Sequence, residues 1–252
     1  MSGAPRRGPL GAGGPLTAVI WHDIECGGYD VDLPLWRELA DREGAPVLEV
    51  GAGTGRVALD LARRGHEVVA LDRDAALLEA LVDRGAGLPV HAVAADARDF
   101  DLGRRFPLIL VPMQTIQLLG GPEGRARFLQ RAREHLAPGG LLAAALADAL
   151  EAFDSEHDEP PLPDLREVGG VVYASRPVAV RDLGDRAAIE RIREVVASDG
   201  TRTVTDDVVE LDRLDPATLT AEAAAFGLRA EAPRRLEATI DYVGSTVVML
   251  RG

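Results

Sequence analysis

The sequence of 252 residues predicts an α/β fold in which helices cover both faces of a mostly parallel sheet. Short apolar runs alternate with segments of helical spacing between residues 31 and 146, as such a fold requires. The first of these runs is followed at once by three glycines at alternate positions, which is typical of a strand that turns tightly into a helix. Hydrophobic residues make up 46% of the chain, enough to build a sizeable core.

The alternation begins with an amphipathic helix over 31–43, which carries Pro34 in its first turn. Glycines at 44, 65 and 85 then stand where helices end. The elements predicted up to residue 146 are strands at 47–50, 66–72 and 141–146, a strand with an acidic turn at 90–100, a strand with its loop at 106–119, and helices at 55–64, about 74–84 and 123–136.

The regular alternation stops after residue 146. Residues 147–163 are acidic and rich in proline, so a loop is expected there. Three β-like runs separated by Gly-Asp and Asp-Gly turns then predict an antiparallel flap. These runs are 170–180, 186–196 and 201–211. A helix over 215–227, with Asp215 as its N-cap and Pro216 at its start, precedes two last strands at about 228–237 and 243–250.

The glycine-rich turn is the most informative stretch of the chain. Glu49 ends the first strand, and Gly51, Gly53 and Gly55 follow it. Glycine is needed where the backbone turns sharply and lies close to a ligand, and the next helix directs free N–H groups at whatever lies above the loop. The dinucleotide fingerprint G-x-G-x-x-G fits the first two glycines, but its third place falls on Arg56.

The pattern observed, E-x-G-x-G-x-G, resembles motif I of the class I S-adenosylmethionine-dependent methyltransferases. Further markers of that family follow in order up to residue 146, including Asp72, Asp96 and an L-x-P-G-G turn before the strand at 141–146. The resemblance implies a doubly wound, Rossmann-like, seven-stranded sheet of order 3-2-1-4-5-7-6. Strand 7 would be antiparallel, and the antiparallel β flap would be inserted after strand 5.

The resemblance also implies S-adenosyl-L-methionine as cofactor, with S-adenosyl-L-homocysteine as product, and it indicates residues that hold the cofactor. Asp72 follows Gly51 by 21 positions and is expected at the ribose hydroxyls, although a helix N-cap role is the alternative. Asp96 is expected at the adenine amino group, and a capped turn is its alternative. The full set expected at the cofactor is Tyr29, Glu49, Gly51, Ala52, Gly53, Gly55, Arg56, Asp72, Arg73, Asp96, Ala97, Pro112, Met113 and Gln114.

The flap, the helix at 31–43 and the stretch D-A-R-D-F-D-L-G-R-R-F resemble those of the small-molecule branch of the family, which includes sugar and amine N-methyltransferases. The branch has a tyrosine-rich segment over the cofactor, and here residues 21–30 keep Tyr29 but have His22 and Cys26 where further aromatic residues are expected. Trp21 and Gln117 are expected at the substrate, with core packing and backbone hydrogen bonding as their alternatives. His22 is the candidate general base because imidazole titrates near neutral pH, and Tyr29 is a second catalytic candidate. Asp23 and His157 are rival bases.

Composition restricts the binding partners and cellular location that can be expected of this protein. The net charge of −13 disfavours a nucleic-acid footprint, and no apolar run is long enough to span a membrane. Cys26 is the only cysteine, which fits a reducing cytoplasm, and no His or Cys pair has the spacing of metal ligands. A homodimer is an option that the sequence does not decide. Residues 1–15 are expected to form a disordered tail because they are rich in glycine and proline.

The predicted organisation is a methyltransferase domain over 16–146 and 213–252, with the flap over 147–212 covering the substrate pocket. The predicted function is transfer of a methyl group to a nitrogen or oxygen atom of a small molecule. One alternative is a non-catalytic, regulatory protein that binds S-adenosylmethionine on the same fold. The other is a NAD-dependent oxidoreductase, which is disfavoured because Arg56 stands where the dinucleotide fingerprint has its third glycine.

Overall fold

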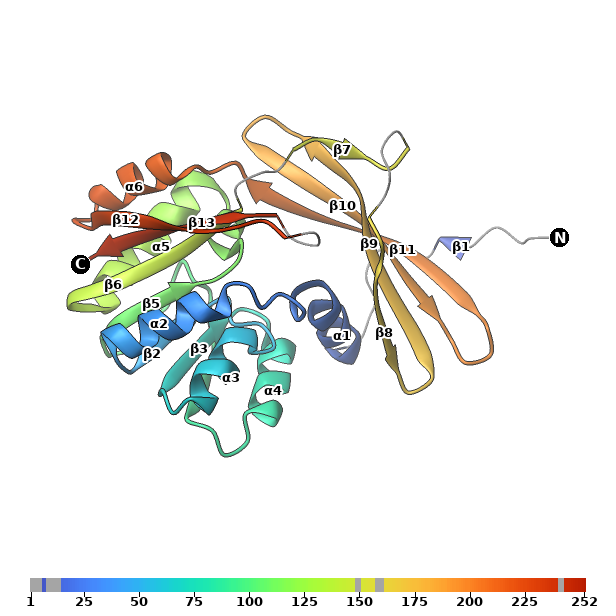
Figure 1. Cartoon of the computed structure of the whole chain (residues 1–252), viewed down its shortest axis with the longest axis horizontal. Coiled ribbons are helices and arrows are strands. Elements are labelled where there is room, and N and C mark those ends of the chain that lie inside the picture. Colours follow the sequence, from blue (N-terminus) through green and yellow to red (C-terminus); the bar gives the residue numbers. More distant parts are fainter. Residues whose placement is uncertain (1–5, 8–14, 148–150, 157–160, 240–242) are drawn as a thin grey trace. The chain divides into compact units, whose positions relative to one another are not determined.

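The computed structural model describes residues 6–7, 15–147, 151–156, 161–239 and 243–252. The chain forms two compact units (Figure 1), one made of Met1–Gly28 and Leu150–Arg213 and the other of Tyr29–Ala149 and Leu214–Gly252. We call them the flap unit and the sheet unit. Residues 16–28 therefore group with the flap strands, whereas the sequence placed them with the methyltransferase domain.

The sheet unit contains a seven-stranded sheet in the order β12-β13-β6-β5-β2-β3-β4. Five of its strands are parallel, and β13 runs antiparallel to both of its neighbours. The predicted order 3-2-1-4-5-7-6 is confirmed, since β13 is the seventh strand of that scheme. The strands are β2 (Val47–Val50), β3 (Val68–Asp72), β4 (Val90–Ala94), β5 (Phe106–Val111), β6 (Leu136–Ala147), β12 (Arg229–Leu236) and β13 (Ser245–Arg251).

Helices cover both faces of this sheet, and each face forms its own apolar core. Side chains of β2 alternate between the two, with Leu48 and Val50 in one core and Val47 in the other. Burying a side chain of this size contributes roughly 1.5–3 kcal/mol. On the Val47 face lie α2 (Leu33–Glu43), α3 (Arg56–Arg63) and α4 (Ala75–Arg84); on the other face lie α5 (Gly121–His135), α6 (Pro216–Ala224) and the short 3₁₀ helix η1 (Thr115–Leu118).

Aspartates cap two of these helices. Asp215 accepts hydrogen bonds from the backbone N–H groups of Ala217 and Thr218, as the sequence predicted. Asp74 accepts equivalent bonds from Ala76 and Leu77 at the start of α4. Such a cap stabilises a helix by about 1 kcal/mol, because it satisfies N–H groups that have no partner within the helix.

The flap unit is built on a sheet that is antiparallel except for β1, which runs parallel to β11, and its three long strands agree with the three predicted β runs. The long strands are β9 (Val171–Asp182), β10 (Arg186–Val196) and β11 (Arg202–Asp212), and the shorter ones are β1 (Arg6–Arg7), β7 (Phe153–Asp154) and β8 (Asp164–Val168). The prediction of a loop over 147–163 was wrong in part, because this segment contains the short strand β7, which pairs with β9. The predicted tail lies mostly outside the described residues, but its Arg6 and Arg7 pair with β11.

The flap unit also contains a helix that the sequence did not predict, α1 (Pro15–Cys26). Ile20, Trp21 and Ile24 of this helix form an apolar cluster with Tyr173 and Val195 of the sheet. This packing is why the helix belongs to the flap unit.

An ion-pair network fastens α1 to the same sheet. Glu25 accepts two hydrogen bonds from Arg193, each of 2.7 Å, and Arg193 also donates to Asp207 at 2.8 Å. Burial raises the pKa of Glu25, but the hydrogen bonds and charge of Arg193 outweigh it, and the pKa lies below its ordinary value.

In the described part of the chain, no helix has the length and hydropathy needed to cross a membrane.

Candidate functional site

The carboxyl ends of β2, β3, β4 and β5 bring the predicted cofactor residues of the sheet unit to one edge. The four strands are parallel, so the loops that follow them emerge at the same edge of the sheet. These loops carry the glycines after β2, Asp72 and Arg73 at the end of β3, Asp96 and Ala97 after β4, and Pro112, Met113 and Gln114 after β5. The structure therefore assembles side chains that are up to 65 positions apart in the sequence (114 − 49).

The glycine-rich loop has a backbone that only glycine adopts easily. Gly51, Gly53 and Gly55 have φ values of 77°, 53° and 92°, all in the left-handed region. A Cβ at Gly51 would lie 2.5 Å from side-chain atoms of Thr115, which belongs to the β5 loop. At Gly51 the backbone therefore approaches Thr115 too closely for any side chain.

Asp72 holds this loop in place. One carboxylate oxygen accepts a hydrogen bond of 2.8 Å from the Gly53 N–H, and the other accepts one of 2.9 Å from the Asp74 N–H. Asp74, not Asp72, is the N-cap of α4, so the alternative of a helix cap at Asp72 was wrong. A carboxylate can accept further hydrogen bonds, so the expected contact with ribose hydroxyls is compatible with both of these bonds.

Glu49 is a buried acid beneath the loop. Its exposed fraction is 2%, and its Oε2 atom has no hydrogen-bond partner among the described residues. Burial raises its pKa to about 8, although the charge of Arg56 and a hydrogen bond from the Ala58 N–H act in the opposite direction. Ala58 is the third residue of α3, so Glu49 also satisfies one free N–H at the start of that helix.

Arg56 contacts protein groups, which the sequence did not reveal. Its guanidinium donates hydrogen bonds of 2.5 and 2.8 Å to the two carboxylate oxygens of Asp32. It donates a third, of 2.8 Å, to the carbonyl oxygen of Tyr29, and it lies 5.2 Å from the centre of the Tyr29 ring. The pair is buried, since Asp32 is 1% exposed. Arg56 therefore joins the segment before α2 to the first turn of α3.

Tyr29 is the only predicted catalytic residue in the sheet unit among those the structure describes. Burial and the charge of Asp32 raise its pKa, against a hydrogen bond with the Ser245 side chain and the charge of Arg56. A raised pKa keeps the phenol protonated at neutral pH, so its hydroxyl is suited to positioning rather than to accepting a proton.

Asp96 forms a local ion pair. Arg98 donates to it from its backbone N–H at 2.8 Å and from its guanidinium at 2.6 Å. These bonds lower the pKa of Asp96 to about 2. The capped turn that the sequence left open for Asp96 is thus present, and the adenine contact remains a prediction. Ala97 packs against the core beside it, and Arg73 is exposed at the tip of β3.

The loop after β5 carries a strained residue. Met113 has a φ of 55°, which a non-glycine residue adopts only at a cost of about 1–2 kcal/mol. Such strain is concentrated at functional sites, because the surroundings must enforce it. Gln117, expected at the substrate, is 1% exposed, and its side-chain oxygen accepts a hydrogen bond of 2.9 Å from the Ala147 N–H. Gln117 therefore bonds to the backbone of β6, 30 positions away, rather than to the local backbone that was its alternative, and its substrate role remains a prediction.

Trp21 and His22 lie on α1 in the flap unit. The Trp21 ring meets the Tyr173 ring edge-on, with 5.4 Å between centres, and Arg193 lies over it. The ring contact fits core packing, which was the alternative for Trp21, and its substrate role remains a prediction. His22 is half-buried, and the rival base His157 lies outside the described residues.

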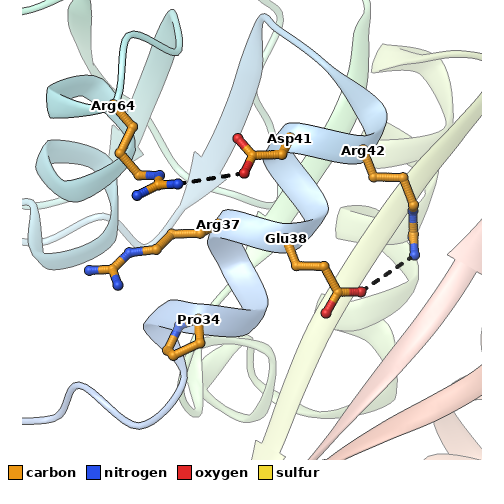
Figure 2. A pocket seen from close by; sticks show the side chains of 6 residues that line it. All are labelled: Pro34, Arg37, Glu38, Asp41, Arg42 and Arg64. Atoms are coloured by element: carbon orange, nitrogen blue, oxygen red, sulfur yellow. Dashed lines mark ion pairs between the residues drawn. The ribbon is translucent and has the colours of Figure 1, made fainter.

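A hollow of about 700 Å³ lies on the outer side of α2 (Figure 2). It is lined by Pro34, Arg37, Glu38, Asp41, Arg42 and Arg64. Its charges are paired with one another or with neighbours, as in Arg37–Asp60 at 2.6 Å and Arg64–Asp41 at 3.6 Å. None of its residues was expected at the cofactor, and its paired charges favour a solvated surface over a binding site.

Comparison with known proteins decides what this edge belongs to. A family model described as a methyltransferase domain matches residues 47–140, which contain β2 to β5 and all the loops above. Residues 47–140 are a methyltransferase domain. The sequence-based prediction of a methyltransferase domain is confirmed by this match, and its class I fold is confirmed by solved structures.

Similarity to known methyltransferases reaches beyond residues 47–140. The cypemycin N-terminal methyltransferase of a Streptomyces species is 29% identical over 163 residues, which are 65% of this chain and 64% of that enzyme. The sugar N-methyltransferase KedS8 of Streptoalloteichus has a TM-score of 0.72 at 22% identity, over 100% of this chain and 99% of that one. CalS10 of Micromonospora echinaspora, an amino pentose methyltransferase, has a TM-score of 0.68 at 24% identity, over 93% and 97%. The two structures show that the fold is shared over nearly its whole length.

Proposed function

We propose that this protein is an S-adenosylmethionine-dependent methyltransferase that transfers a methyl group to a nitrogen or oxygen atom of a small molecule. The observation that carries the proposal is the edge formed by the glycine-rich loop, Asp72 and the β5 loop inside a methyltransferase domain. The single cysteine further favours a reducing, cytoplasmic location.

The residues at this edge fit the cofactor. The unpartnered Oε2 atom of Glu49 offers an acceptor, and the three glycines leave the loop backbone without side chains at their positions. Gly51 and Gly53 would let the backbone approach the aminoacid tail, and Asp72 would accept hydrogen bonds from the ribose. When bound, S-adenosylmethionine supplies a methyl group on a strongly electrophilic sulfonium.

The chain's own contribution is mainly alignment. Holding the acceptor atom in line with the methyl group can contribute roughly 7–11 kcal/mol in favourable cases. Pro112, Met113 and Gln114 follow β5 at the same edge, and we propose that they border the reacting atoms. An amine acceptor needs only to arrive neutral, whereas a hydroxyl acceptor must lose its proton, for which His22 is the proposed base.

Nitrogen is the acceptor atom to test first, because the relatives compared above are an N-terminal, a sugar N- and an amino pentose methyltransferase. Calorimetric titration with S-adenosylhomocysteine and, separately, with NADH tests the cofactor. We expect S-adenosylhomocysteine to bind and NADH to give no heat. Binding of NADH alone would overturn the proposal in favour of an oxidoreductase.

Turnover separates an enzyme from a regulatory protein. A panel of amino sugars, peptide amines and phenols is incubated with S-adenosylmethionine, and S-adenosylhomocysteine is measured. The Gly53→Val variant should lose cofactor binding and turnover together, because a branched side chain strains a backbone with a φ of 53° and projects from the loop. Gly87→Val is the matched control, since Gly87 also has a positive φ but nothing within 4 Å and lies before β4. Cofactor binding without turnover on any acceptor would favour the regulatory alternative.

A further inference from the structure

Glu49 combines two features that bear on its state of protonation. Its carboxyl group lies inside the protein, with an exposed fraction of 2% for the residue. One of its oxygens, Oε2, has no hydrogen-bond partner among the described residues. A buried carboxylate with an unsatisfied oxygen is costly, and the cost falls if the group binds a proton or if a cation arrives beside it.

The charged groups around Glu49 do not supply that cation. Among the described residues that shift its pKa, Arg56 of α3 is the one positive group, and both arms of its guanidinium bind Asp32. Asp32, before α2, and Asp72, at the end of β3, are negative and act against ionisation of Glu49. The Ala58 N–H favours the carboxylate, but burial outweighs it. The free protein therefore favours a neutral Glu49.

We propose that Glu49 carries a proton in the cofactor-free protein and releases it when the ammonium group of the cofactor's aminoacid tail binds. Cofactor binding would then be linked to pH through this one carboxyl group. The inference rests on the proposed function, because it requires a cofactor with an ammonium group at the glycine-rich loop. It adds to that function a proton that leaves to solvent as the ion pair forms, so charge is balanced within the site.

The pH dependence of affinity gives the first test. S-adenosylhomocysteine is the probe, because it has the ammonium group but no sulfonium charge, and its amino group stays protonated below a pKa of about 8. Since the pKa of Glu49 is about 8, one proton must be removed for each molecule bound at lower pH. We expect the dissociation constant to be about tenfold higher at pH 6 than at pH 7 for a one-proton linkage. The Glu49→Gln variant should bind more weakly and lack this difference.

Calorimetry measures the released proton directly in the wild-type protein. Titrations at pH 7 in buffers of different ionisation enthalpy should show release of close to one proton per S-adenosylhomocysteine. 5′-Methylthioadenosine, which lacks the aminoacid tail, is the control ligand and should release none. Binding of S-adenosylhomocysteine without proton release, or equal release by the Glu49→Gln variant, would overturn the inference and leave the proposed function standing. Failure of S-adenosylhomocysteine to bind at all would overturn the proposed function instead.

The cofactor-free protein gives an independent readout. A folded-state pKa raised above the unfolded value means that ionising Glu49 destabilises the fold as pH rises from about 4.5 to 8. The melting temperature of wild type should therefore fall relative to that of Glu49→Gln over this range. A constant difference between the two proteins from pH 5 to pH 8 would contradict a protonated Glu49.

Discussion

The Arg56–Asp32 pair allows a quantitative test of how the glycine-rich loop is held. Arg56 is 11% exposed at its side chain and Asp32 is 1% exposed, so both charges are largely out of water. The substitution Arg56→Met leaves the Asp32 carboxylate buried without its partner. Removing one member of a buried ion pair costs about 3–5 kcal/mol, and we expect a loss of this size in the free energy of unfolding of the sheet unit.

Tryptophan fluorescence in urea can follow the sheet unit alone. The chain has two tryptophans, Trp21 in the flap unit and Trp36 in the sheet unit, and Trp36 is fully buried. A Trp21→Phe background leaves Trp36 as the reporter. Arg63→Met is the matched control, because Arg63 lies exposed on the same helix, and we expect it to change stability by less than about 0.5 kcal/mol.

The double variant Arg56→Met with Asp32→Leu completes a thermodynamic cycle. Replacing both members of a buried pair by apolar residues is often neutral or even stabilising, so the double variant should recover most of the loss. Losses that add, or a loss below about 1 kcal/mol for Arg56→Met alone, would refute the view that this pair fastens α3 to the segment before α2.

Three further predictions concern the same edge of the sheet. Asp72→Ala should weaken binding of S-adenosylhomocysteine by about 10- to 100-fold in calorimetry, as expected for hydrogen bonds to a charged group, and an unchanged affinity would exclude a ribose contact. Gly51→Ala should lower both stability and cofactor affinity, because its Cβ would meet Thr115 at 2.5 Å, and the Gly51→Ala/Thr115→Ala double variant should regain part of both in thermal and binding assays. Arg98 holds the pKa of Asp96 at about 2, so the stability gained from Asp96 is present above pH 4 and lost as pH falls from about 4 to 2. A comparison with Asp96→Asn in acid should show the two proteins converge over that range, and a gap that persists at pH 2 would contradict the ion pair.

Local patterns were enough to predict most strands and helices of the sheet unit, whereas the order of its strands came from the family resemblance. Its strands and helices alternate at short range, and glycines, prolines and aspartates mark their ends, as Asp215 and Pro216 do for α6. Where a residue and its structural reason lie within a few positions, the sequence contains the whole argument. The predicted bounds of β2, α3 and α4 accordingly agree with the structure to within a residue or two.

The parts that escaped prediction depend on distant residues. Helix α1 is held by Glu25–Arg193, a pair separated by 168 positions, so nothing near Glu25 indicates its partner. Strand β8 is exposed at every residue, and it therefore shows no alternation of apolar and polar side chains. Asp32 lies at the N-cap position of α2, yet its side chain makes no cap and binds Arg56, 24 positions away.

The position of β13 has a consequence for how the protein is made. This strand comes after all the others in chain order, yet it pairs with β6 on one side and β12 on the other. Until it is synthesised, the backbone of β6 offers an open row of hydrogen-bonding groups to any neighbouring chain. The backbone of β13 then pairs with that row, and the side chains of Val247, Val248, Met249 and Leu250 are buried. A chain truncated before Ser245 should therefore leave that edge of β6 unpaired, and the pairing of β13 is the step that closes the sheet.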